Sequence, residues 1–110
     1  MTPFSFETKP IDRGVSVRIA GRATADQSQT IDSTFDGIIA GSPDIVVLDC
    51  AGLEFIGSFF IGALVRLGTE LQGPGRLRIA AAPDGVLEAL RQSRLDDRFP
   101  LYATVEEACR

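Results

Sequence analysis

Few residues in this chain of 110 have side chains suited to chemistry. There is no histidine, which removes Ser-His-Asp and Cys-His catalysis and most zinc sites. The two cysteines, Cys50 and Cys109, have no CxxC spacing, and we expect both to be small apolar fillers in a reducing compartment. Adjacent carboxylates occur only as Asp96-Asp97 and Glu106-Glu107, and neighbouring side chains do not converge on a helix. We therefore predict no enzyme activity, no metal site and no cofactor.

The glycine pattern gives no phosphate cradle. Gly52, Gly57 and Gly62 do not form GxGxxG, and GxxxxGK[ST] does not occur. The segment GSFFIG also lacks the GxSxG order of a nucleophile elbow. These patterns argue against nucleotide-binding and hydrolase sites of the common kinds.

Ser58 is the polar residue whose position is informative. The run Ile45–Leu48 predicts a buried strand, followed by a tight connection of about eight residues. An amphipathic helix that begins at Ser58 is predicted by an apolar stripe made of Ile61, Leu64, Val65, Gly68 and Leu71. As N-cap, the Ser58 hydroxyl would accept a hydrogen bond from an unpaired backbone N–H. A phosphate there would add about −1.5 to −2 charges to a segment, Phe55–Val65, that carries none.

Phe59 and Phe60 directly follow this serine, at the first positions of the predicted helix. Two rings there cannot both point inward, so at least one should cover the loop or face solvent. One interpretation is a hydrophobic lid over the edge of the sheet. The other is an apolar anchor for a partner or a lipid-like ligand.

The residues before this region predict a hairpin and a helix. Phe4–Lys9 and Val15–Ala20 alternate in polarity, and Pro10 suggests that the first of these strands lies at an edge. Helical spacing then relates Ile31, Phe35, Ile38 and Ile39, with Thr24 or Asp26 as cap and Gly41 at the end.

The residues after the Ser58 helix predict a short strand that lies between two glycine- or proline-containing segments. Gly73-Pro74-Gly75 ends the Ser58 helix, and a short strand covers Leu77–Ala81. Pro83 suits the first turn of a further helix, and Phe99 and Leu101 anchor a short extended piece. Thr104 should cap a final helical turn, with Glu107 as the acid of a capping box.

This order of elements is typical of an α/β fold. Strands separated by helices imply crossovers, so we predict a mixed, mostly parallel sheet of four to five strands with an N-terminal hairpin and about four helices. Residues 1–110 are expected to form one domain. The net charge of −4 argues against nucleic acid as the partner. No apolar run is long enough to insert in a membrane and no signal peptide is evident, so we expect a cytoplasmic protein.

Four segments of the chain are similar to a known family. They are Gly21–Thr24 after the second strand, DCAGLEFIGSFFIGAL over Asp49–Leu64, the later LRIAAAPDGVLEAL, and Tyr102–Ala108. The chain resembles STAS domains of the anti-sigma factor antagonist type, which typically show G-x-L/I-D after a strand and then D-L-S-G-V-x-F-I-D-S-S-G-L-G-A-L. The match covers essentially the whole chain, and the fold implied is STAS-like.

The resemblance implies a regulatory role by partner switching. In such systems an anti-sigma factor with kinase activity binds either a sigma factor or the STAS protein, phosphorylation of the STAS serine ends that binding, and a phosphatase restores it. Ser58 stands at the position of the phosphorylated serine. The partner-binding residues implied are Arg22, Thr24, Glu54, Gly57, Ser58, Phe59 and Phe60.

The chain departs from the family pattern at three places. Thr24 replaces the acidic residue of G-x-L/I-D, Gly57 replaces the aspartate before the serine, and Phe59-Phe60 replaces the small pair after it. Two other functions fit a STAS-like domain: a subunit of a lipid-handling ABC transporter complex, and a small-molecule or nucleotide sensor. The partner, the upstream signal and the oligomeric state are left open by the sequence.

Overall fold

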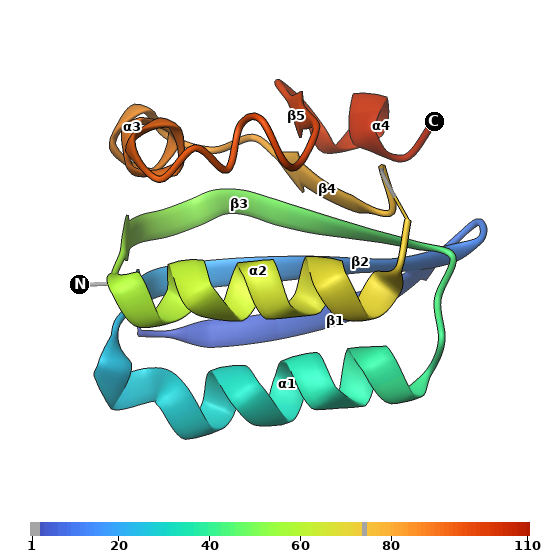
Figure 1. Ribbon diagram of the computed structural model, residues 1–110, viewed down its shortest axis with the longest axis horizontal. Helices are drawn as coiled ribbons and strands as arrows, with labels where there is room; N and C mark the ends of the chain where they lie inside the picture. The colour runs from blue at the N-terminus through green and yellow to red at the C-terminus, as the bar shows by residue number, and fades with distance from the viewer. Residues whose placement is uncertain (1–2, 74) are drawn as a thin grey trace.

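The strands form one sheet with the predicted mixed pairing. The computed structural model describes residues 3–73 and 75–110, so Pro74 of the predicted break lies outside the described residues. Within these ranges five strands are ordered β1-β2-β3-β4-β5 (Figure 1). The first pair is antiparallel and the other three pairs are parallel, which confirms the predicted sheet and its N-terminal hairpin. The strands are β1 (Ser5–Ile11), β2 (Gly14–Ala23), β3 (Ile45–Ile56), β4 (Leu77–Ala80) and β5 (Leu101–Tyr102).

The helices cover the two faces of this sheet unequally. One face carries α1 (Ser28–Ala40) and α2 (Ser58–Leu71), which run alongside each other (Figure 1), and α3 (Asp84–Gln92). The short α4 (Val105–Ala108) packs on the other face. A short 3-10 helix, η1 (Ala25–Gln27), leads into α1. No helix among the described residues is long and apolar enough to cross a membrane.

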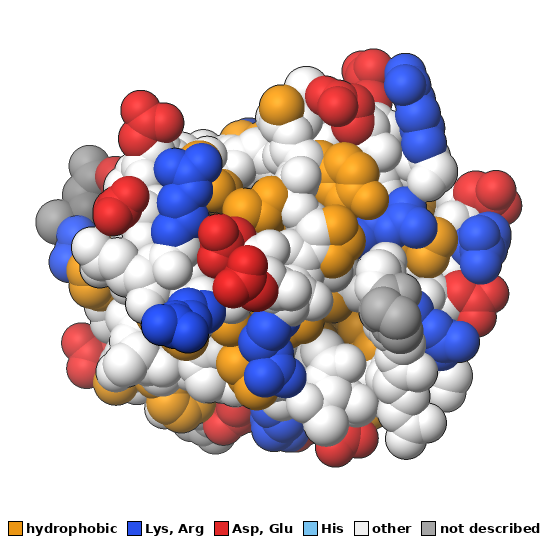
Figure 2. Space-filling model, turned by 45° about the horizontal axis from the view of Figure 1, so that its top comes forward, with side chains coloured by type: hydrophobic (Ala, Val, Ile, Leu, Met, Phe, Trp, Pro, Cys, Tyr) orange, Lys and Arg blue, Asp and Glu red, His pale blue; other side chains and the backbone are white. Residues whose placement is uncertain are grey.

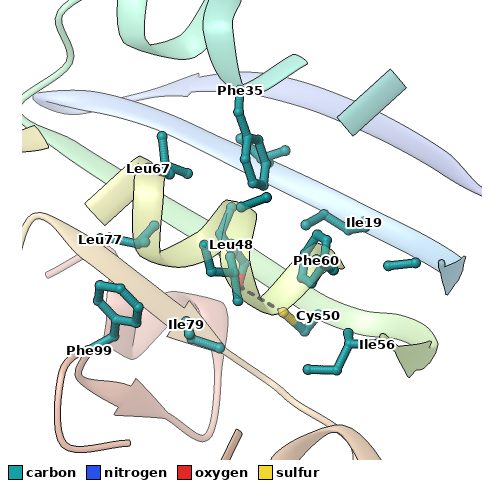
Figure 3. Packing of buried hydrophobic residues seen from close by; sticks show 14 of the residues in the cluster. Ile19, Phe35, Leu48, Cys50, Ile56, Phe60, Leu67, Leu77, Ile79 and Phe99 are labelled. Carbon is teal, nitrogen blue, oxygen red and sulfur yellow. Dashed lines mark hydrogen bonds between the residues drawn. The ribbon is translucent and has the colours of Figure 1, made fainter. Parts of the chain in front are cut away.

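The main core lies between the sheet and the three helices on its first face. The rings of Phe35 from α1 and Phe60 from α2 are tilted by 52° with centroids 6.0 Å apart. Figure 3 shows both among the core residues around Leu48 of β3. The guanidinium of Arg66 joins these two helices at the surface, 3.0 Å from the carboxylate of Asp36. A smaller cluster on the opposite face consists of Ile45, Val47, Ala80 and Ala108.

The predicted connection between strand and helix is wrong, because β3 continues through it. Instead of ending near Leu48, β3 runs to Ile56, and Gly57 alone separates it from α2. The cause is the neighbouring strand: β2 keeps pairing with β3 as far as Ala23 opposite Ile56. Two register shifts in this ladder place Leu53 and Ile56 in the core, while polar neighbours remain at the surface.

The inward face of α2 differs from the predicted stripe. Leu64 and Leu71 are buried as predicted, but Ile61, Val65 and Gly68 are only half-buried. The helix is rotated because Phe60 fills the space beside Phe35, and this rotation brings other side chains inward. The buried residues of α2 are Phe60, Ala63, Leu64, Leu67 and Leu71.

Two of the predicted helix caps are also corrected. Neither Thr24 nor Asp26 caps α1, which is preceded by Gln27 without a side-chain hydrogen bond. Pro83 is the residue before α3 rather than in its first turn. The Thr104 cap is confirmed, since its hydroxyl accepts a hydrogen bond from the backbone N–H of Glu107 at 3.2 Å. The edge position of the first strand is confirmed too, with Pro10 inside β1.

Cys50 lies in β3 inside the main core, and its Sγ donates a long hydrogen bond of 3.7 Å to the carbonyl of Leu48 (Figure 3). Burial, with a smaller contribution from the charge of Asp49, raises the pKa of the Cys50 thiol from 9.0 to about 12. Cys109 is half-buried near the C-terminus. The prediction that Cys50 is an apolar filler fits this burial.

We expect the two thiols to react at very different rates. At pH 8 a thiol reagent should label Cys109 readily and Cys50 only after unfolding, as followed by mass spectrometry with site mapping.

Between pH 9 and about 12 the folded chain retains a proton on Cys50 that the unfolded chain has released, so the free energy of unfolding should fall as pH rises through this range. Cys50→Ala should reduce that alkaline loss. Equal labelling of both cysteines in the folded protein would contradict the burial.

Gly14 begins β2, where the chain passes very close to the next strand. A methyl group on Gly14 would overlap the backbone carbonyl of Ile45, which cannot move without disturbing the β2–β3 ladder. Gly14→Ala should therefore lower the free energy of unfolding by about 2 kcal/mol or more, measured by urea denaturation. Gly62→Ala is the control, because this glycine on α2 has open space around it and should gain up to about 1 kcal/mol from helix propensity.

Candidate partner-docking site at the start of α2

Ser58 lies at the surface, at the first position of α2. Gly57 before it is extended, and its N–H donates to the carbonyl of Ala23 at 2.9 Å. The Gly57 carbonyl then accepts the first helical hydrogen bond, from Ile61 at 3.1 Å. Gly57 is therefore the N-cap, and the prediction that Ser58 caps the helix with its hydroxyl is wrong. The Ser58 side chain is exposed, so another molecule can reach it.

The two phenylalanines after Ser58 point in different directions. Phe60 is 1% exposed and its ring packs against Phe35, so it belongs to the core rather than to a docking surface. This corrects its predicted role in partner binding. Phe59 is half-buried against the edge of the core, which leaves part of its ring at the surface. The structure confirms the expectation that only one of the two rings points fully inward.

Arg22 and Phe55 form a pair at the end of the sheet where α2 begins. They are register partners at the ends of β2 and β3, and the guanidinium carbon of Arg22 lies 4.6 Å from the centroid of the Phe55 ring. Phe55 is 41% exposed, a large apolar side chain with an unusual share of its surface in solvent. Phe55 was missed as a site residue; continuing the strand alternation past Leu48 would have indicated that it points outward.

Thr24 and Glu54 complete this end of the sheet. Thr24 is half-buried where β2 turns into η1, and its α-carbon lies 3.9 Å from the position that a Gly57 side chain would take. Glu54 is exposed on β3 directly before Phe55. The structure thus brings together all the predicted partner-binding residues except Phe60. We call the resulting area the Ser58 surface; it comprises Arg22, Thr24, Glu54, Phe55, Gly57, Ser58 and Phe59.

The Ser58 surface offers docking chemistry. It presents two hydroxyls, one cation, one carboxylate and two aromatic side chains, all at least partly exposed. Among the described residues no cluster of His, Cys, Asp or Glu is suited to hold a metal ion. Aromatic and arginine side chains are enriched at protein–protein interfaces, so this surface is suited to binding another protein.

The described residues also form a cleft that is separate from the Ser58 surface. A cleft of about 730 Å³ lies between α1, the β1–β2 hairpin and the loop before β3, at the opposite end of β3 from Ser58. Its lining includes Thr8, Ser33 and Thr34 and none of the predicted site residues. On the face shown in Figure 2, basic and acidic side chains of the described residues are interspersed, with small apolar areas between them.

Comparison with known proteins identifies the family. Residues 5–108 match the STAS domain, and the chain belongs to this family. No curated protein sequence matches the chain significantly. The recognition of a STAS domain from the segments around Ser58 is therefore confirmed.

Solved structures show the same fold. An anti-sigma factor antagonist from Mycobacterium paratuberculosis superposes with a TM-score of 0.89 at 22% identity, covering 96% of this chain and 91% of that one. The anti-sigma factor antagonist SpoIIAA in its unphosphorylated form gives 0.79 at 21% identity, with 94% and 92% covered. The Bacillus cell fate determinant SpoIIAA in its phosphorylated form gives 0.72 at 21% identity, with 94% and 96% covered. This chain is thus a STAS domain that resembles anti-sigma factor antagonists in its fold.

Replacing the two phenylalanines should lower the stability of the protein by different amounts. Phe60→Ala removes a buried ring and should lower the free energy of unfolding by about 3–5 kcal/mol in urea denaturation. Phe59→Ala removes a half-buried ring and should cost clearly less, about 1 kcal/mol, because less apolar surface is lost. Equal destabilisation by the two substitutions would contradict the division between core and surface.

Proposed function

We propose that this protein is a regulatory binding module of the anti-sigma factor antagonist type, which binds a switch kinase through the Ser58 surface. The observation that carries the proposal is the exposed Ser58 at the first turn of α2, within the segment that resembles the family motif. Membership of the STAS family and a fold shared with anti-sigma factor antagonists support it. SpoIIAA has been solved in both phosphorylated and unphosphorylated forms, so phosphorylation has a precedent in a protein of this fold.

In the proposed cycle, the kinase first docks on the Ser58 surface in its unphosphorylated form. The half-buried ring of Phe59 supplies apolar contact beside Ser58, and Arg22 and Glu54 supply charges at the rim. Aromatic and arginine side chains commonly dominate the affinity of an interface, and an aromatic ring buries a large area at low entropic cost. The complex would keep the kinase away from its other partner, a sigma factor.

Phosphorylation then ends the complex. The Ser58 Oγ attacks the γ-phosphorus of ATP in the kinase; the Oγ–P bond forms, the bond to the β–γ bridging oxygen breaks, ADP leaves and the hydroxyl proton passes to a base of the kinase. The phosphate adds about −1.5 to −2 charges to the docking surface. Binding weakens because the charge must be desolvated and repels acidic groups of the partner. A phosphatase that hydrolyses the phosphoester restores the binding form.

The first test is phosphate transfer to the intact protein. Incubation with its cognate kinase and ATP should add one phosphate by intact mass, located on Ser58 by fragmentation. Ser58→Ala should gain none, while Ser33→Ala, which changes an exposed serine of α1, should behave as the wild type. Unchanged mass of the wild type, or transfer to Ser58→Ala, would exclude the phosphorylation switch.

The second test is the identity of the bound partner. Affinity capture with the wild type should recover a serine kinase of the anti-sigma type, and Phe59→Ala should reduce that recovery by at least about tenfold if the ring is a central contact. Gly37→Ala serves as control, since this exposed glycine of α1 lies away from the Ser58 surface and an added β-carbon there would meet no atom of the chain within 4 Å. Recovery of a permease–ATPase complex in place of a kinase would reject the proposal in favour of the transporter alternative.

A further inference from the structure

Arg22 is an exposed cation at the end of β2, the end of the sheet at which α2 and Ser58 begin. The ion pairs found within the described residues join Arg66 to Asp32 and Asp36, and Arg22 takes part in none. Asp26, the acidic residue nearest to Arg22 along the chain, and Glu54, which precedes its register partner Phe55, are both exposed. The contact that orients the Arg22 guanidinium is the ring of Phe55, 4.6 Å away. Such a contact at an exposed site is weak and is readily exchanged for a stronger one.

A continuous set of contacts leads from this guanidinium to Ser58. The Phe55 ring that carries it also lies 3.5 Å from the point where a Gly57 β-carbon would be. Gly57 is hydrogen-bonded to Ala23, the residue after Arg22, and is followed directly by Ser58. Arg22, Phe55, Gly57 and Ser58 therefore form one contiguous group at this end of the sheet.

From this arrangement we infer that Arg22 is the internal counter-ion of a phosphate on Ser58. The inference rests on the proposed function, in which Ser58 is the phosphoacceptor. A guanidinium can donate two parallel hydrogen bonds to a phosphate, and this geometry is stronger than stacking on an exposed ring. Phosphorylation therefore draws Arg22 away from Phe55 to the phosphate.

The exchange changes the Ser58 surface in two ways at once. The phosphate adds negative charge, of which Arg22 neutralises a part. At the same time the face of the Phe55 ring loses its covering cation and becomes free for apolar contact. The phosphorylated protein thus presents an aromatic ring next to an anion, a surface distinct from the unphosphorylated one and suited to a phosphatase or another reader of the modified state.

The test measures the phosphate directly and needs no kinase. Phosphoserine is incorporated at position 58 by genetic encoding, and the second pKa of the phosphate is followed by ³¹P NMR. With Arg22 present this pKa should lie about half a unit below that of the same protein carrying Arg22→Gln, because a nearby cation favours the dianion. Arg18→Gln is the matched control, since it removes the same charge from an exposed position of β2 and should leave the pKa close to its wild-type value.

The second readout follows the Arg22 side chain. In the unphosphorylated protein its δ-methylene and Nε–H protons should show an upfield ring-current shift, which Phe55→Leu removes. Encoded phosphoserine should reduce this shift. Equal phosphate pKa values in the wild type, Arg22→Gln and Arg18→Gln, or an unchanged ring-current shift, would overturn the inference. Arg22→Lys should retain part of the pKa effect as a point charge, which shows that the loss in Arg22→Gln reflects charge and not misfolding.

Failure of this inference is distinguishable from failure of the proposed function. The proposed function fails if the kinase adds no phosphate to Ser58, which intact mass measures on the unmodified protein. The role of Arg22 is measured separately, as the second pKa of an encoded phosphate that needs no kinase. A normal kinase reaction combined with equal phosphate pKa values would therefore keep the proposed function and reject the role of Arg22.

Discussion

The parallel ladder between β2 and β3 is the interaction on which the rest of this structure depends. It begins with Gly14 opposite Ile45 and persists to Ala23 opposite Ile56, through two shifts of register. Its last step is the hydrogen bond from Gly57 to the Ala23 carbonyl, which directly precedes α2. Because the ladder ends there, the helix begins at the rim of the sheet, and Ser58 is exposed while Phe60, two residues later, reaches the core.

The order and type of the elements could be predicted from local patterns, whereas the extent of β3 could not. Alternating residues in the first two strands and helical spacing in α1 are local signals, and both are realised. Asp49, Gly52 and Glu54 have low strand propensity, so local sequence favours a connection over a strand in their segment. Pairing with β2 overrides that preference, because each backbone group on a central strand gains a hydrogen-bonding partner.

The candidate site, like the fold, could be predicted only in part from the sequence. Ser58 could be located because the apolar run, the helical stripe and the family motif converge on it. The neighbouring pair of Arg22 and Phe55 could not, since their contact depends on a register shift between strands far apart in sequence. The burial of Phe60 likewise depends on the position of Phe35 in another helix. Both facts are tertiary, and no pattern within a single segment contains them.

The antiparallel pairing of β1 has a consequence for what can be joined to this protein. Ser5 lies opposite Ala20 near the far end of β2, so the chain enters the sheet at the end where α2 starts, while the C-terminus lies at the other end (Figure 1). A purification tag, fluorescent label or fused domain placed ahead of β1 would emerge beside the serine and crowd it. The same attachment after α4 would leave that end unobstructed, which makes the C-terminus the suitable point for immobilisation.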